Sequence, residues 1–198
     1  VDAESIYRQS LALYQELPGT ELDQADCLYN LANTLSDLNK STEAESIRRQ
    51  ALALYQTIPG TERDQADCLH ALANTLDELD KPAQAEPFFR EALALYQTIP
   101  STQHEQARCL YNLANTLHKL GKNAQAEPLY RQAITLYQTI PGTQQKQANC
   151  LNNLATTLDD LGKPTQAEPL YRQALTFFQT LPGTQHEQSN CLYNLANS

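Results

Sequence analysis

The sequence predicts an all-α fold, a right-handed superhelical solenoid of antiparallel helix pairs that repeat every 41 residues. The first observation is that cysteines recur at a constant step of 41 residues, at Cys27, Cys68, Cys109, Cys150 and Cys191. The second is that the phrase QADCLYNLANTL at 24–35 returns with the same step. The third is that apolar residues within each copy are spaced by three and four, which places them on one face of a helix. A fixed period of about 20 to 50 residues is typical of solenoids.

We expect residues 1–198 to form a single repeat array, because one helix pair cannot bury both of its apolar stripes and must stack on its neighbours. The expected division is a second helix of a partial repeat at 1–19, full helix pairs at 20–60, 61–101, 102–142 and 143–183, and the first helix of a partial repeat at 184–198. The chain begins at Val1 and contains no Met, so we also expect it to be an excerpt of a longer array.

The first helix of each full repeat is predicted to begin after a threonine that has an acidic residue three positions later, as in Thr20 with Asp23. A hydroxyl cap followed by an acid is typical of helix starts. Thr143 is followed by Lys146 instead, which predicts a weaker start there. The apolar stripe of this helix is Leu28, Leu31, Ala32, Leu35 and Leu38. The adjacent Cys27 series is expected to be buried as small apolar side chains, and Gly121 and Gly162 are expected to end two of these helices.

The second helix is predicted to start near Pro82 and its equivalents and to stop at a Pro-Gly pair such as Pro59-Gly60. Its apolar stripe is Ala44, Ile47, Ala51, Leu54 and Tyr55. Glu45 and Arg49 lie four residues apart and recur in every copy, so we expect exposed ion pairs on this helix. Three prolines, Pro87, Pro128 and Pro169, are expected in or just after the first turn, where a missing N–H costs least.

The composition excludes several classes of function. The net charge of −9 argues against nucleic acid and anionic membranes as partners. No apolar run approaches the about 20 residues needed to span a bilayer. Five evenly scattered cysteines favour a reducing compartment, and we expect a cytoplasmic protein. The cysteines and histidines lack metal or catalytic spacing, and no phosphate loop or nucleophile motif is present, so we expect no enzyme activity, metal or cofactor.

Leu-x-x-Leu-Ala in the first helix and Ala-Glu-Pro-Leu-Tyr-Arg-Gln-Ala-Leu in the second resemble the tetratricopeptide repeat, in its longer kinesin-light-chain-like form. The resemblance covers the whole chain. Arg48 departs from it, because the equivalent positions hold Tyr7, Phe89, Tyr130 and Tyr171. The resemblance implies protein–protein interaction through a concave groove lined by first helices.

Residues on the polar face of the first helices form the candidate peptide-binding site that this resemblance implies. They are Asn30, Asn33, Asn74, Tyr111, Asn112, Asn115, Asn153 and Asn194. An asparagine side-chain amide both donates and accepts hydrogen bonds, so it can bind the backbone of an extended peptide whatever the sequence of the peptide. The alternative is that these asparagines cap or bridge neighbouring repeats, or only form a polar surface.

The charges on this face indicate the partner. Asp26, Asp37 and Asp67 make the early repeats acidic, whereas a small basic patch consists of Arg108, His118 and Lys119. We therefore expect a neutral or basic peptide or protein partner. A second hypothesis is end-to-end self-association into a filament, because both ends of the array expose unmatched stacking surfaces. A third is that the repeats regulate another domain of a larger protein.

Overall fold

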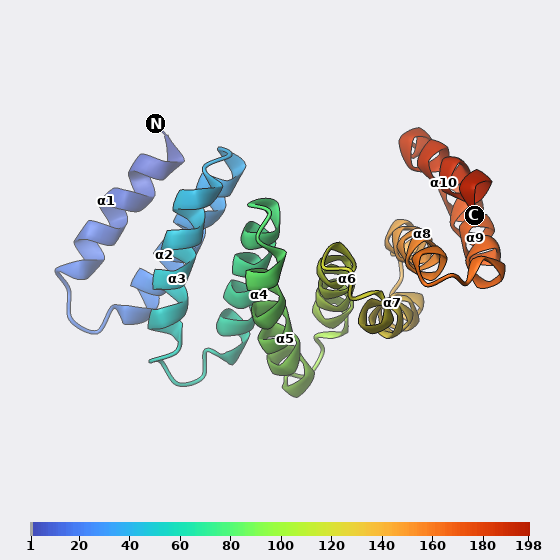
Figure 1. Cartoon of the computed structure of the whole chain (residues 1–198). Coiled ribbons are helices and arrows are strands. Elements are labelled where there is room, and N and C mark those ends of the chain that lie inside the picture. Colours follow the sequence, from blue (N-terminus) through green and yellow to red (C-terminus); the bar gives the residue numbers. More distant parts are fainter. Residues whose placement is uncertain (1) are drawn as a thin grey trace. The chain divides into compact units, whose positions relative to one another are not determined.

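The computed structural model describes residues 2–198, which form ten α-helices and no β-strand (Figure 1). The helices are α1 Ala3–Gln15, α2 Glu21–Asp37, α3 Ser41–Tyr55, α4 Glu62–Glu78, α5 Pro82–Thr98, α6 Gln103–Lys119, α7 Asn123–Gln138, α8 Gln144–Asp160, α9 Pro164–Thr180 and α10 Gln185–Asn197. The predicted all-α fold of consecutive helix pairs is confirmed.

The chain forms two compact units, Val1–Pro100 and Ser101–Ser198. In the first unit, α2 pairs with α3 and α4 with α5, while α1 packs on α2 and α3 on α4. In the second unit, α6 pairs with α7 and α8 with α9, while α7 packs on α8 and α9 on α10. Each unit therefore buries the apolar stripes of its helices through contacts between neighbours, as expected for stacked repeats.

Most residues of the predicted apolar stripes are buried in the core, whereas Ile47 and Leu54 are half-buried. Leu31 and Leu35 of α2 pack with Ala44 of α3, and Tyr7 and Ile47 contact this cluster. Leu38 was expected on the same stripe, but its side chain is 47% exposed. Leu38 is the C-cap residue of α2, where the helix ends before the next helix can cover it.

The threonines that precede the first helices donate hydrogen bonds to the preceding helix and do not cap the following helix as predicted. Thr61 is the N-cap residue of α4, yet its side chain makes no capping bond to that helix. Its Oγ1 donates to the carbonyls of Tyr55 and Ile58, at 2.7 and 2.9 Å. Gln65 Nε2 donates to the same Tyr55 carbonyl at 3.2 Å. The Thr-x-x-x-Gln pattern therefore satisfies carbonyls at the end of the preceding helix, which lack partners within that helix.

This pattern recurs where the same bonds are described, at Thr20 with Gln24, Thr143 with Gln147 and Thr184 with Gln188. In these repeats it ties the first helix to the helix before it. Helix ends follow the prediction more closely, because Gly121 and Gly162 both adopt a φ of +70° after the last residues of α6 and α8. Asn39 and Asp80 take the same conformation at the equivalent positions, with φ of 59° and 56°, and both residue types tolerate it.

The prolines of the second helices lie just after the first turn, as predicted, but the expected low cost is wrong. Pro87 is the sixth residue of α5, which begins at Pro82. An N–H at this position would bond to the carbonyl of Ala83, so proline removes one bond of the helical ladder. Pro128 in α7 and Pro169 in α9 occupy the same position.

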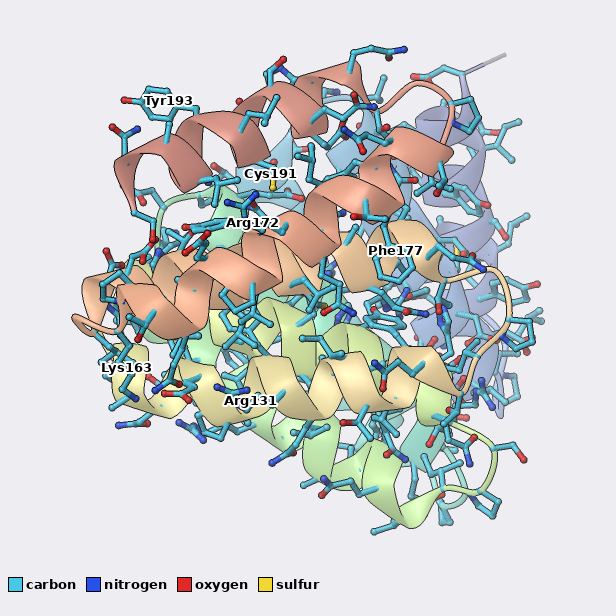
Figure 2. The ribbon with its side chains drawn as sticks, turned by 90° about the vertical axis from the view of Figure 1, so that its right-hand side faces the viewer. Arg131, Lys163, Arg172, Phe177, Cys191 and Tyr193 are labelled. Carbon is cyan, nitrogen blue, oxygen red and sulfur yellow. The ribbon has the colours of Figure 1, made fainter. Side chains whose placement is uncertain are left out.

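The five cysteines are buried free thiols, as predicted. The Cys68 thiol donates to the Arg48 carbonyl at 3.4 Å, and the Cys191 thiol donates to the Tyr171 carbonyl at 3.2 Å. Figure 2 shows the Cys191 sulfur turned toward the interior, whereas Tyr193 on the same helix points outward. Burial raises the pKa of Cys68, Cys109 and Cys150 to about 12, so these thiols stay protonated and unreactive near neutral pH.

The predicted Glu–Arg pairs form on the second helices, and the carboxylates of Glu4, Glu45 and Glu127 also bind a lysine of the next repeat. Glu127 binds Arg131 of its own helix at 3.0 Å and Lys163, just before α9, at 2.9 Å (Figure 2). Glu45 makes the same two contacts, with Arg49 at 3.1 Å and Lys81 at 2.8 Å. In each of these two groups of one glutamate, one arginine and one lysine, the carboxylate links consecutive helix pairs. The hydrogen bond from the lysine is the main cause that lowers the pKa of Glu45 and of Glu127.

We expect the stabilising contribution of Glu127 to be lost on acidification. A carboxylate whose pKa is lower in the folded chain than the unfolded value of about 4.3 stabilises the fold above that value. This contribution disappears as the pH falls through the folded pKa. The Tm difference between the native chain and Glu127→Gln should therefore be largest at pH 6 and shrink toward pH 3. A pH-independent difference in thermal melts would contradict this origin.

Candidate functional site

In the second unit, three of the predicted site residues form a hydrogen-bonded bridge between helices. The amide of Asn153 on α8 donates to Asn115 Oδ1 at 3.0 Å and to the Tyr111 hydroxyl at 3.1 Å, both on α6. The buried Tyr130 hydroxyl of α7 also donates to Asn115 Oδ1, at 2.6 Å. Tyr111 and Tyr130 pack edge to face with ring centroids 6.1 Å apart. Asn115 and Asn153 therefore hold three helices in position. This is the bridging role that the sequence indicated as an alternative to peptide binding.

In the first unit, the predicted asparagines lie in different environments. Asn30 on α2 is exposed. Asn33 is half-buried and accepts a bond from Arg48 Nη2 at 3.0 Å. Asn74 on α4 is half-buried, with its amide 3.3 Å from His70 Nδ1. Asn194, the last of the predicted series, is half-buried on α10 of the second unit.

Arg48 occupies the position that holds a buried aromatic ring in three other repeats, at Phe89, Tyr130 and Tyr171, and it is itself only 5% exposed. Its guanidinium donates to Asn33 and Ser36 of α2, and to the Thr75 hydroxyl of α4. All three acceptors are neutral, and its Nε is buried without a hydrogen-bond partner. Burial is the main cause that lowers the pKa of Arg48. A polar link across α2, α3 and α4 thus replaces apolar packing at this position.

The tyrosines near the ends of α3, α5 and α7 mark a difference between the two units. The Tyr55 hydroxyl donates to Asp26 at 2.7 Å, and the Tyr96 hydroxyl donates to Asp67 at 2.6 Å. Burial, followed by the charges of Asp26 and Asp67, raises the pKa of Asp64. This part of the first unit is therefore a dense group of carboxylates.

In the second unit, the position of these aspartates is taken by Arg108, and the following first helix carries Lys146. The Lys146 ammonium lies 6.0 Å from the centre of the Tyr137 ring, within range of a cation–π contact. Repeat positions that carry carboxylates in the first unit therefore carry cations in the second unit, around Tyr137.

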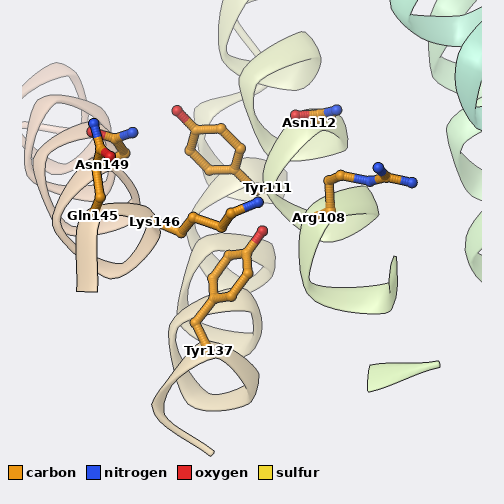
Figure 3. A pocket seen from close by; sticks show the side chains of 7 residues that line it. All are labelled: Arg108, Tyr111, Asn112, Tyr137, Gln145, Lys146 and Asn149. Atoms are coloured by element: carbon orange, nitrogen blue, oxygen red, sulfur yellow. The ribbon is translucent and has the colours of Figure 1, made fainter. Parts of the chain in front are cut away.

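A pocket of about 360 Å³ lies at this place, between α6, α7 and α8 (Figure 3). Its volume is in the range of small-ligand and side-chain sites, which is about 300 to 1,000 Å³. The pocket is lined by Arg108, Tyr111, Asn112, Tyr137, Gln145, Lys146 and Asn149. Two of the predicted site residues, Tyr111 and Asn112, therefore line a cavity.

Sequence reasoning missed most of this lining, namely Tyr137, Gln145, Lys146 and Asn149. A signal was present, because Lys146 stands where the other copies hold Asp23, Asp64, Glu105 and Glu187. The predicted basic patch also divides. Arg108 lies at the pocket, whereas His118 at the end of α6 is 3.1 Å from Asn123 Oδ1 and 3.6 Å from Asp160 Oδ2.

Within residues 2–198, no group of three or more His, Cys, Asp or Glu side chains could hold a metal ion. In the same residues, no helix is long and apolar enough to cross a bilayer.

Comparison with protein families gives two matches. The tetratricopeptide repeat family matches residues 1–57, 27–98 and 105–180, and a second family with the description tetratrico peptide repeat matches residues 66–135. Together these matches cover most of the chain. No curated protein sequence matches it.

Solved structures share the fold at low identity. BtubC (BKLC) from P. vanneervenii superposes with a TM-score of 0.77 at 22% identity, over 97% of this chain and 80% of that one. A putative kinesin light chain from Podosopora anserina with nearly identical TPR-like repeats gives 0.73 at 16% identity, over 91% and 87%. The apo form of RapI gives 0.82 at 13% identity, over 93% of this chain but 50% of RapI.

Proposed function

Because this chain belongs to the tetratricopeptide repeat family, we propose that it is a non-catalytic scaffold that binds an extended segment of a partner protein on its first helices. Repeats of this family generally form interaction scaffolds. The observation that carries the proposal is the pocket of about 360 Å³ that Tyr111 and Asn112 line on α6. It offers aromatic surface and amide groups together, which suits contact with both side chains and backbone of a peptide.

We assign four of the predicted site residues to two different roles. Asn112 in the second unit lines the pocket, and Asn30 at the same repeat position in the first unit is exposed, so we assign peptide contact to these two. Asn115 and Asn153 hold α6, α7 and α8 together and act as positioning residues. Replacing them would change the helix packing as well as any peptide contact, which makes them poor probes of binding.

The carboxylates of the first unit support a basic group in the partner segment. Asp26 and Asp67 each already accept a tyrosine hydroxyl, while Asp64 has its pKa raised by burial and by these two neighbours. A lysine or arginine of a partner would relieve the repulsion among the three. This favours a partner segment with a positive side chain toward the first unit.

The test is selection of binders from a random library of unmodified 12-residue peptides displayed on phage, a length of about 40 Å when extended, against the full chain. Selected peptides should bind Asn112→Ala about tenfold more weakly than the native chain, because hydrogen bonds to a buried backbone are lost. Gln138→Ala is the control, since this exposed amide of α7 lies outside the pocket lining. Failure to select any peptide, or equal affinity for Asn112→Ala, would contradict binding at this place.

A second candidate function is end-to-end self-association. Ala3 in α1 is exposed, whereas Ala44, Ala85, Ala126 and Ala167 at the same repeat position are fully buried. Leu192 in α10 is 49% exposed, whereas Leu28, Leu69, Leu110 and Leu151 are buried. The α1 face of one copy and the α10 face of another carry the residue types that pack together within each repeat. We propose this contact as the source of any filament.

Sedimentation velocity over a wide concentration range tests this second candidate. Growth into heavier species that Leu192→Glu abolishes would support it, because a charge would be placed in the proposed contact. The exposed and unrelated Gln138→Glu substitution serves as the control. A monomer at all concentrations would exclude self-association by this chain.

A further inference from the structure

The pocket between α6, α7 and α8 has a positive lining. Of its seven residues, Arg108 and Lys146 are cationic and none is acidic. The remaining five residues are two tyrosines and three amide side chains, all of which can donate hydrogen bonds. A net charge of −9 on the chain makes this local balance unusual for the molecule.

The two cations of the pocket lack the acidic partners that five arginines of the second helices have. Five arginines, Arg8, Arg49, Arg90, Arg131 and Arg172, each bind the glutamate four residues earlier. Within residues 2–198, neither Arg108 nor Lys146 has a carboxylate within ion-pair distance. Arg108 Nε is also buried without a hydrogen-bond partner. Arg108 is half-buried and Lys146 is exposed. Cations without a counter-charge beside several hydrogen-bond donors favour an anionic ligand.

The other repeats show that these cations are not needed for folding. The position of Lys146 holds an acid in every other copy, and the position of Arg108 holds Asp26 and Asp67 in the first two. In those two copies the carboxylate accepts the tyrosine hydroxyl. The charge reversal therefore gives up a hydrogen bond found elsewhere in the chain and opens a cationic pocket around Tyr137.

We propose that this pocket receives a phosphorylated side chain of the partner segment, an inference that rests on the proposed function. A phosphate group carries about −1.5 to −2 charges at pH 7 and has three acceptor oxygens. Its charge matches the two cations, and its oxygens match the several donors of the lining, whereas a single carboxylate would leave one cation uncompensated. Figure 3 shows Lys146 extended toward Tyr137 and the guanidinium of Arg108 turned away from Lys146. We expect Arg108 to change rotamer when one phosphate contacts both cations.

Blocked amino acids serve as probes in a titration of the full ¹⁵N-labelled chain followed by NMR. The probes are N-acetyl-O-phosphoserine amide, N-acetyl-O-phosphotyrosine amide, N-acetyl-glutamate amide and N-acetyl-tyrosine amide. The phosphorylated probes should bind about tenfold more tightly than the glutamate probe, because a second charge is engaged. Comparison of the phosphoserine and phosphotyrosine probes shows whether the aromatic lining also contributes.

Two variants taken from the chain's own repeats test the cations. Lys146→Glu places here the residue type of Glu105 and Glu187, and Arg108→Asp places that of Asp26 and Asp67. Each should weaken the phosphorylated probes by about tenfold or more, because a repulsive charge replaces an attractive one. Lys119→Glu changes the net charge equally at the exposed end of α6, about 16 Å along the helix from Arg108. The affinity of Lys119→Glu for the phosphorylated probes should stay within about twofold of the native value, because surface charges at that distance are screened.

Three outcomes overturn the proposal: no binding of the phosphorylated probes, equal binding of the glutamate probe, or undiminished binding to Lys146→Glu with an unchanged far-UV circular dichroism spectrum. The proposed function is tested independently by the unmodified peptides. If those peptides bind through Asn112 while the phosphorylated probes fail, the scaffold function stands and the phosphate assignment is wrong. If phosphorylated probes bind through Lys146 while no unmodified peptide is selected, the proposed binding of an unmodified segment is wrong and only the phosphate assignment stands.

Discussion

Replacing Tyr130 with alanine is expected to lower the free energy of unfolding by about 3–5 kcal/mol, the usual cost of truncating a buried aromatic ring. The Tyr130 side chain is only 1% exposed and packs edge to face on Tyr111. Its hydroxyl donates to Asn115, which in turn accepts from Asn153. Truncation therefore leaves a cavity between α6, α7 and α8 and removes one donor to Asn115.

Guanidinium denaturation followed by circular dichroism measures this loss. Tyr130→Phe separates the ring from the hydroxyl and should cost about 1 kcal/mol, since Phe89 fills the equivalent position without a hydroxyl. Tyr193→Ala is the matched control, because this side chain is 72% exposed and should change stability by less than about 0.5 kcal/mol. Equal effects of Tyr130→Ala and Tyr193→Ala would show that the core described for the second unit is wrong.

Replacing Arg48 with phenylalanine is expected to raise the free energy of unfolding by about 1–3 kcal/mol, because buried charges can often be exchanged for apolar side chains with a gain. Arg48 is buried, has an unpartnered Nε and donates only to neutral oxygens. Phe89 at the same repeat position packs edge to face on His70, with ring centroids 5.5 Å apart. The residue equivalent to His70 beside Arg48 is Tyr29, which offers the same kind of ring.

The hydrogen-bond acceptors of Arg48 keep other hydrogen-bond partners when phenylalanine replaces the arginine. Thr75 keeps the bond from its hydroxyl to the Ala71 carbonyl at 3.0 Å, and Asn33 and Ser36 are half-buried and can be reached by water. Native-state hydrogen exchange should show increased protection of the amides of α2, α3 and α4 in Arg48→Phe. The exposed Arg49→Gln is the control and should change stability by less than about 0.5 kcal/mol. A variant less stable than the native chain by more than about 1 kcal/mol would show that the polar link of Arg48 is worth more than its burial costs.

Much of the fold could be predicted because repetition makes each local signal visible five times. The cysteine series, the apolar stripes and the Glu–Arg pairs each depend on spacing within one or two helices, which helical geometry alone determines. The threonines show the limit of this reasoning. Thr61 was expected to cap α4, but the carbonyls of the preceding helix compete for its hydroxyl. That competition exists only when the two helices are packed together.

The candidate site was predictable only in part, for the same reason. Periodicity placed Asn112, Asn115 and Asn153 on one polar face. It could not say that Asn115 and Asn153 bond to each other while Asn112 lines a cavity, because partners 38 residues apart meet only through helix stacking. The pocket likewise combines Tyr137 of one helix with Arg108 and Lys146 of two others.

By itself, the sequence determined that this protein consists of paired helices with a 41-residue period and an acidic surface, since these properties follow from spacing and composition. Tertiary structure decided which polar residues bridge helices, how Arg48 is accommodated, and where two unpaired cations surround a tyrosine. Hydrogen-bond partners and cavities depend on distances between side chains of different helices. Those distances arise from packing, which no local pattern of residues specifies.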